Sequence, residues 1–252
     1  MQTQESNVVR FGQAASLRCA DCRLQRICVM NTVASHCGGE TGIKCGRPLA
    51  RGHHLFRQGE RLQALYIVRS GSAKSYVSTP DGLEQVIRFH LPGDLIGVDA
   101  LGEGMHTSSA QAMEMITVCR FPLEVIEDAA GHDPALYAQI LKHAGREITK
   151  EHARAVLLAQ RGADERLAAF LLQMSDAYAH LGYSALAFNL PMARQDIASY
   201  LALAVETVSR LFTNFQHEGL LEVDRRSIRI PSLERLRAVA RASAKTLMTV
   251  NG

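Results

Sequence analysis

Short strand-like runs of mainly apolar residues recur along the chain between residues 51 and 121. They read ALYIVRSG, SAKSYVST, LEQVIRFH and MEMITVCRF. Turn-forming pairs separate them, namely Ser70-Gly71, Asp81-Gly82 and Pro92-Gly93, with a further glycine cluster at 102–104. Turn signals at this spacing predict a compact antiparallel roll or barrel.

The segment that follows, HDPALYAQILKHAGREITKEHARAVLLAQ, has the pattern of a long helix. Asp133 suits its N-cap, Pro134 suits its first position, and Gly162 ends it. Small or apolar residues then recur at steps of four and three, close to the 3.5-residue repeat of a two-stranded coiled coil. The predicted dimer seam consists of Ile140, Ala144, Ile148, Glu151, Ala155 and Leu158.

One position of this seam is an acid, and two interpretations of it stay open. A helix that packs on its own domain would place Glu151 at the solvent edge. A dimer helix would bring two Glu151 side chains face to face, so that association is marginal and a small input can switch it.

A further helix and a second small domain are predicted after Gly162. The run ADERLAAFLLQMSDAYAHLG is apolar at Leu167, Phe170, Leu171 and Met174, and Gly182 suits its C-terminal end. Residues 191–230 then contain a helix of about eight residues, a short turn, a longer amphipathic helix and two strand-like pieces. This order is typical of a winged helix-turn-helix.

The longer of these two helices has two contrasting faces. Val205, Val208, Phe212 and Phe215 form an apolar stripe, and the opposite stripe consists of Glu206, Ser209, Arg210 and Thr213. In a DNA groove, arginine can bind guanine bidentately and glutamate can accept from cytosine, each contact discriminating by about 1–3 kcal/mol. These four polar residues are the candidate DNA-binding residues.

An ordinary helical hairpin with a solvated charged face is the competing interpretation. Two alanines favour it. Ala202 stands where a turn glycine is expected, and an alanine at positive φ is strained. Ala204 stands where a capping Ser or Thr would help, and a missing cap costs about 1 kcal/mol.

The charge of the chain is unevenly distributed. The 252 residues carry a formal net charge of +3, and residues 182–252 hold nine Lys and Arg against six Asp and Glu, while residues 1–181 hold nineteen of each. This excess favours a polyanion partner for the C-terminal part. The start, MQTQESNVVR, lacks a signal-peptide pattern, and no run reaches the roughly 18 apolar residues of a membrane span, so we expect a cytoplasmic protein.

Three cysteines, Cys19, Cys22 and Cys28, crowd into the stretch LRCADCRLQRIC. In the reducing cytoplasm such cysteines point to metal binding or redox sensing more than to a disulfide framework. Four thiolates suit an iron–sulfur cube, one per iron, and they suit structural zinc equally. The spacing alone leaves both open.

Several of these runs resemble one family. VETVSRLFTNFQHEGLL, ADERLAAFLL, LYIVRSGSAKSY, EQVIRFHLPGDLIGVDALG and the Cys-x2-Cys-x5-Cys opening resemble the fumarate and nitrate reduction regulator (FNR) branch of the cyclic-AMP receptor protein superfamily. The similarity covers residues 47–230 and 19–28. It implies an α+β fold with an N-terminal β-roll sensor domain, a long dimerisation helix and a C-terminal winged helix-turn-helix.

The resemblance also implies a function. Such proteins are not enzymes but homodimeric transcription regulators, and an oxygen-labile 4Fe-4S cluster controls their binding to palindromic TTGAT-type sites in double-stranded DNA. The matching ligands are Cys19, Cys22, Cys28 and the distant Cys119. The matching DNA-reading residues are Glu206, Ser209 and Arg210. The implied segments are 1–46 (cysteine-rich), 47–132 (roll), 133–161 (dimerisation helix) and 162–252 (DNA-binding domain).

Other features refine the expected partners. PGDLIGVDALGEGMHTSSAQA offers no arginine for a phosphate, so we expect no cyclic nucleotide as effector. The turn from Thr79 to Gln85 is a candidate contact for RNA polymerase. Residues 31–46 depart from the family pattern and add Cys37 and Cys45, which makes a local ligand set imaginable. A regulator of this fold that uses zinc or a thiol–disulfide switch is the alternative.

Overall fold

A computed structural model describes residues 22–25, 28, 44–132 and 134–246 of the chain. The chain divides into two compact units, residues 1–147 and 148–252. The boundary falls inside the longest helix, α3 (Pro134–Gln160), which begins at the predicted proline. Asp133, its predicted N-cap, lies outside the described residues. The four-segment division expected from the sequence stays a prediction.

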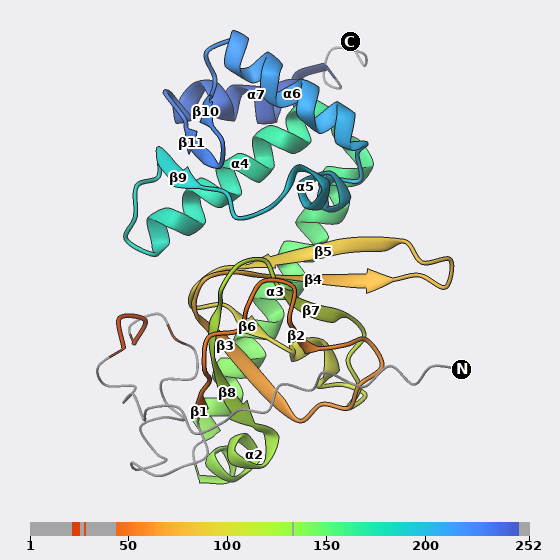
Figure 1. The fold of residues 1–252 in the computed structure, drawn as a ribbon, viewed down its shortest axis with the longest axis vertical. Coiled ribbons are helices and arrows are strands. Elements are labelled where there is room, and N and C mark those ends of the chain that lie inside the picture. Colours follow the sequence, from red (N-terminus) through yellow and green to blue (C-terminus); the bar gives the residue numbers. More distant parts are fainter. Residues whose placement is uncertain (1–21, 26–27, 29–43, 133, 247–252) are drawn as a thin grey trace. The chain divides into compact units, whose positions relative to one another are not determined.

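The first unit contains two antiparallel sheets of four strands each in its described part (Figure 1). Their strand orders are β1-β8-β3-β6 and β2-β7-β4-β5. The strands are β1 Lys44–Cys45, β2 His54–Phe56, β3 Ala64–Ser70, β4 Ala73–Ser78, β5 Glu84–His90, β6 Leu95–Ile96, β7 Ser109–Ala112 and β8 Thr117–Pro122. A 3-10 turn, η2 (Val98–Ala100), and a helix, α2 (Leu123–His132), complete the unit together with the first part of α3.

The predicted β-roll is confirmed strand by strand. The four strand-like runs form β3, β4, β5 and β8. Glycine at the β3–β4 turn is required twice over: Gly71 has φ +77°, and a Cβ there would collide with the carbonyl of Met115.

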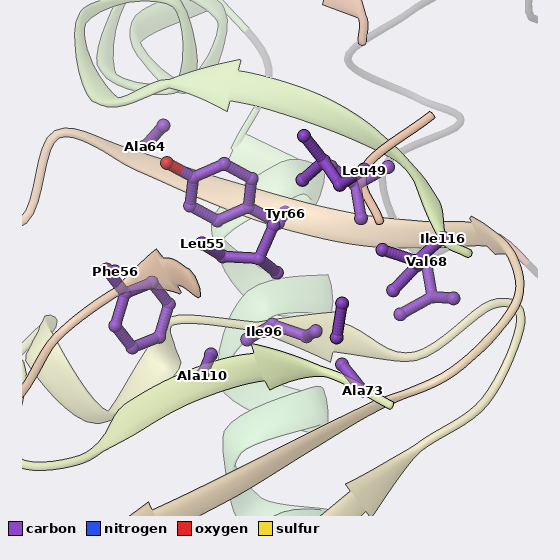
Figure 2. Close-up of a cluster of buried hydrophobic side chains, with 12 residues drawn as sticks. Leu49, Leu55, Phe56, Ala64, Tyr66, Val68, Ala73, Ile96, Ala110 and Ile116 are labelled. Carbon is purple, nitrogen blue, oxygen red and sulfur yellow. The ribbon is translucent and has the colours of Figure 1, made fainter. Parts of the chain in front are cut away.

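Strand β3 distributes its side chains to two cores because successive residues point to opposite faces. Ala64, Tyr66 and Val68 belong to the core between the two sheets, shown in Figure 2. Leu65 and Ile67 belong to a second cluster on the other face. The remaining buried members of this second cluster are Leu95, Phe121, Ile126 and Ile140. The outer face of the first sheet is therefore covered by α2 and by the start of α3.

The second unit is helical, with a small three-stranded sheet of order β10-β11-β9. Its elements are α4 Ala163–His180, β9 Ala187–Asn189, α5 Arg194–Leu201, α6 Val205–His217, β10 Glu222–Asp224, β11 Ser227–Arg229 and α7 Leu233–Thr246. The order of a short helix, a turn, a longer helix and a hairpin confirms the predicted winged helix-turn-helix. The apolar residues predicted for the buried face of α4 are all buried.

Two glycines mark the ends of α4. Gly162 serves as its N-cap, where its N–H donates to Glu165 Oε2 at 2.7 Å, and a Cβ would approach Asp164 Oδ1 to 2.8 Å. Gly182 has φ +81° just after the last turn, as predicted.

Candidate DNA-binding surface and cysteine site

The helix-turn-helix presents its four candidate residues to solvent. Glu206, Ser209, Arg210 and Thr213 are all exposed on α6. The opposite face is held by Val208, Phe212 and Phe215, which are buried. Val205, the other residue of the apolar stripe, is the first residue of α6 and is 36% exposed.

Both alanines behave as the sequence predicted. Ala202 has φ 52° and ψ 50°, a left-handed conformation at the end of α5, and Ala204 caps α6 without a side-chain hydrogen bond. The helix-turn-helix therefore forms despite a strained turn and a missing cap.

Arginines that sequence reasoning missed support this turn. Arg154 of α3 donates to Tyr200 O at 3.3 Å and lies over the Tyr200 ring, and Arg166 of α4 donates to Leu201 O at 3.2 Å. They satisfy carbonyls at the C-terminal end of α5, where the helix dipole also favours positive charge. The one sequence signal for this role was the presence of the two arginines in helices that are otherwise amphipathic.

Three cysteines of the cysteine-rich segment lie among the described residues, namely Cys22, Cys28 and, in β1, Cys45. Cys22 and Cys28 flank a turn in which Gln25 N–H donates to Cys22 O at 3.0 Å and Cys28 N–H donates to Leu24 O at 2.8 Å. Cys19 and Cys37 lie outside the described residues.

Two of the predicted ligands, Cys28 and Cys119, lie against the same apolar cluster. Both are partly buried against the group that contains Phe121 of β8 and Ile140 of α3. Val118 belongs to the core between the sheets, so the alternation along β8 places Cys119 on the outer face. The fold thus places two cysteines that are more than ninety residues apart in the sequence against one apolar cluster.

The described cysteines fit an iron–sulfur group by chemistry and by placement. Soft thiolate donors are the ligands that such clusters take, and Cys28 and Cys119 share one cluster of side chains. Within the described ranges, no three His, Cys, Asp or Glu residues already form a metal-binding group. Cys22, Cys28 and Cys119 therefore do not form a ready-made set of three ligands.

In the loop that we expected to lack a phosphate site, the carboxylate of Asp99 accepts hydrogen bonds from neighbouring residues. Asp99 Oδ2 accepts from the backbone N–H groups of Thr107 and Ser108 at 2.9 and 3.1 Å and from both hydroxyls, while Oδ1 lies 3.3 Å from His106 Nδ1. Burial alone would raise the pKa of Asp99, but hydrogen bonds from His106 and Ser108 outweigh it and lower the pKa. His106 in turn stacks on Phe56.

The long helix shows a different stripe from the predicted one. Ile140 is buried, with 7% of its surface exposed, inside its own unit, whereas the next residue, Leu141, is 70% exposed. Ile148 is 57% exposed, and Glu151 and Ala155 are exposed as well. Ala144 and Leu158 are half-buried.

Glu151, the acid of the predicted seam, forms an ion pair. Glu151 Oε2 lies 3.3 Å from Arg154 Nη1, and the same arginine reaches Tyr200 O. The seam acid is therefore paired with a side chain that also holds the end of α5.

The turn considered as a polymerase contact is exposed and internally ordered. Thr79 N–H donates to Leu83 O at 2.9 Å, and its hydroxyl bonds Asp81. Gly82 has φ +84°, and Leu83 is one of the exposed large apolar residues. The turn therefore exposes the apolar side chain of Leu83 and the acidic side chains of Asp81 and Glu84 to solvent.

Comparisons with known proteins agree with this architecture. Residues 165–239 match the Crp-like helix-turn-helix domain, and residues 47–133 match the cyclic nucleotide-binding domain. The fumarate and nitrate reduction regulatory proteins of Salmonella typhi and of Escherichia coli K12 are each 39% identical over 240 residues, 94% of this chain and 96% of theirs. The chain belongs to the CRP/FNR family of transcription regulators.

Membership in the CRP/FNR family makes the chain a DNA-binding regulator and not an enzyme. The structure of FixK2 from Bradyrhizobium japonicum superposes with a TM-score of 0.72 at 29% identity, covering 79% of this chain and 98% of that one. Among the described residues, no helix is both long and apolar enough to cross a bilayer.

Proposed function

We propose that this CRP/FNR-family protein is an oxygen-responsive regulator of anaerobic gene expression in the cytoplasm. It binds palindromic TTGAT-type DNA as a homodimer while a 4Fe-4S cluster is intact. The observation that carries this proposal is the meeting of Cys28 and Cys119 on one apolar cluster. The 39% identity to fumarate and nitrate reduction regulatory proteins supports it.

Cys19, Cys22, Cys28 and Cys119 would hold the cluster. Bound there, it supplies an oxygen-labile cross-link between the N-terminal segment and the roll. The chain's own contribution is the placement of Cys119 against the apolar cluster that also contains Ile140 of α3. A change at this thiol is therefore expected to reach the long helix through that cluster.

The exposed stripe of α3 supplies the dimer surface. Because Ile140 is buried, we assign Leu141 to the seam in its place. The seam then has strict seven-residue repeats. One row contains Leu141, Ile148 and Ala155, and the other contains Ala144, Glu151 and Leu158. Leu141 and Ile148 gain most from being covered, since they are the most exposed apolar members. A dimer presents two copies of α6, and losing the dimer removes half of the DNA contacts.

On DNA, the exposed face of α6 reads base edges. Arg210 would bind a guanine and Glu206 would accept from a cytosine. Ser209 and Thr213 donate to the carbonyls of Val205 and Ser209, at 2.9 and 3.2 Å, and so present their oxygens from fixed positions.

The roll takes no cyclic nucleotide in this proposal. The N–H groups of Thr107 and Ser108 already donate to Asp99, so a phosphate would have to displace a carboxylate that accepts four hydrogen bonds. The exposed turn around Asp81 and Leu83 is the proposed contact with RNA polymerase, through which the dimer acts as an activator.

Iron and labile sulfide content test the proposal directly. Protein purified without oxygen is expected to contain both, to be dimeric and to prefer a TTGAT palindrome over a scrambled duplex. The same sample exposed to air should lose sulfide, dissociate and lose that preference. Zinc in place of iron, or an air-insensitive dimer with unchanged DNA binding, contradicts the proposal.

A further inference from the structure

Two cysteines occupy directly opposite positions in the first sheet. Strand β1 pairs antiparallel with β8, and the register places Cys45 opposite Cys119. Strand β1 has only two residues and forms the edge of the sheet. Cys45 is among the cysteines by which the sequence departs from the family pattern.

The hydrogen bonds around this pair define its type. Gly46 N–H donates to Val118 O at 3.0 Å, which makes the next position along a hydrogen-bonded one. Hydrogen-bonded and non-hydrogen-bonded positions alternate in antiparallel pairs, so Cys45 and Cys119 form a non-hydrogen-bonded pair. Such pairs hold their α-carbons about 4.5 Å apart. Disulfides span α-carbon separations of roughly 4.4–6.8 Å, so the backbone already has a spacing that a disulfide tolerates.

We propose that Cys45 and Cys119 form a reversible cross-strand disulfide when Cys119 carries no iron. This inference rests on the proposed function, in which Cys119 is the distant ligand of the cluster. A disulfide sulfur is not a thiolate, so Cys119 bonded to Cys45 is unavailable as a ligand. The two states of Cys119 exclude each other, and the disulfide fastens the short edge strand to β8.

The oxidant is a small-molecule disulfide such as oxidised glutathione. The Cys119 thiolate attacks one sulfur of it, forms a mixed disulfide and releases one glutathione thiolate. The Cys45 thiolate then attacks the Cys119 sulfur and releases the second glutathione thiolate. Two electrons pass from the protein to the oxidant, and the two cysteine protons end on two molecules of glutathione.

The disulfide changes what oxygen exposure does to the protein. A released thiolate can be oxidised to sulfinic and sulfonic acids, which are not readily reversed, whereas a disulfide is restored by thiols. Cytosolic disulfides are usually transient and redox-sensing, in keeping with such a role. Cys119 would be stored in a recoverable form, and rebuilding of the iron site would require prior reduction.

Peptide mapping of the full chain tests the pair. Trypsin releases Cys45 in residues 45–51, since the bond between Arg47 and Pro48 resists cleavage, and releases Cys119 in residues 89–120. Each peptide contains a single cysteine. Air-exposed protein is treated with oxidised glutathione, its remaining thiols are alkylated, and it is digested without reductant. Mass spectrometry should find these two peptides joined, and should find them separate after reduction.

Two variants serve as the matched pair. Cys45→Ser should abolish the joined peptide and leave Cys119 alkylated or glutathionylated, while Cys37→Ser, from the same N-terminal segment, should leave the joined peptide at its original yield. Cys119 joined instead to any other cysteine, or found only as a glutathione adduct in the unmodified chain, overturns the inference.

Iron content separates this inference from the proposed function. Cys45→Ser prepared without oxygen should retain as much iron as the unmodified chain. After oxidation, Cys45→Ser should take up iron again without a thiol reductant. The unmodified chain should need the reductant for the same step. Loss of iron from Cys45→Ser would make Cys45 a ligand and overturn the disulfide. A joined peptide in a chain that never contains iron would keep the disulfide and reject the cluster.

Discussion

The DNA-binding surface and the cysteine site are built on different principles. The four candidate residues of the first lie within eight positions of one helix, α6, and the buried face of that same helix fixes their direction. The second draws Cys28 and Cys119 from opposite ends of the first unit to one apolar cluster. One site is local in sequence, and the other exists only after the sheet has formed.

This difference has a physical consequence for each site. A helix-borne surface keeps its geometry as long as α6 packs through Val208, Phe212 and Phe215. A site assembled across a sheet responds to anything that alters strand pairing or the cluster beside it. Sensing is therefore suited to the first unit and constant recognition to the second.

Removal of the distant sulfur should have the largest effect. Cys119→Ser is expected to eliminate nearly all iron and sulfide from protein prepared without oxygen, because a hydroxyl is a poor replacement for a soft thiolate. Cys37→Ser should retain them. Iron analysis and visible absorbance provide the measurement, and the reverse result would move the site entirely into the N-terminal segment.

The sequence predicted the local site more fully than the assembled one. Periodicity placed Val208, Phe212 and Phe215 correctly, and it anticipated the left-handed Ala202 from the absence of a glycine. Val205 shares that stripe but is exposed at the first residue of α6, and periodicity does not record where a helix begins.

The assembled site depended on register, which is not visible in a single sequence. Nothing in the sequence indicated that Cys45 pairs with Cys119, because a shift of one residue would turn the strand over. The predicted seam contains Ile140 and not Leu141 for a related reason. Both are apolar, and only the position of the roll decides which of them is buried.

Loss of a base-reading side chain should break recognition while leaving the fold intact. Arg210→Ala is expected to lower affinity for a TTGAT palindrome by about 1–3 kcal/mol, roughly 5–150-fold, and to remove the preference at one guanine. Binding to unrelated duplexes should change little. Fluorescence anisotropy with single-base variants measures this. Arg237→Ala, an exposed arginine on α7, is the control, and equal weakening on all sequences would argue against base reading.

Loss of the internal anion tests the first unit without touching its cysteines. Asp99→Ala leaves the donors of Thr107 and Ser108 without their acceptor and should lower the free energy of unfolding by about 1–3 kcal/mol at neutral pH. Asp176→Ala, an exposed acid on α4, should change it by less than about 0.5 kcal/mol.

The effect of Asp99 should also depend on pH. Its pKa is lowered in the folded state, so its stabilisation is fully present above the ordinary carboxyl pKa and is lost as the pH falls through the folded-state pKa. Urea unfolding at neutral and strongly acidic pH should show the difference between Asp99→Ala and the unmodified chain shrinking in acid. A difference that grows in acid would contradict this sign.

Removal of the seam acid, Glu151, should have a smaller effect. Glu151→Ala takes away a charge repelled by its copy across the proposed dimer, so the iron-free protein should dimerise more tightly by up to about 1 kcal/mol. Sedimentation in air measures the monomer fraction. Glu127→Ala on α2 is the control, and an unchanged monomer fraction in Glu151→Ala would remove the seam charge from the account.

The smallest effect concerns the turn between α5 and α6. Ala202→Gly removes the strain of a left-handed alanine. Glycine also has a greater entropy in the unfolded chain, which offsets part of this gain, so the free energy of unfolding should rise by about 0.5 kcal/mol. Ala169→Gly, inside α4, should instead destabilise by about 1 kcal/mol. DNA affinity of Ala202→Gly should stay within about twofold, because Arg154 and Arg166 still hold the last carbonyls of α5. Thermal unfolding measures both changes. If both variants were destabilised, Ala202 would not be strained in its left-handed conformation.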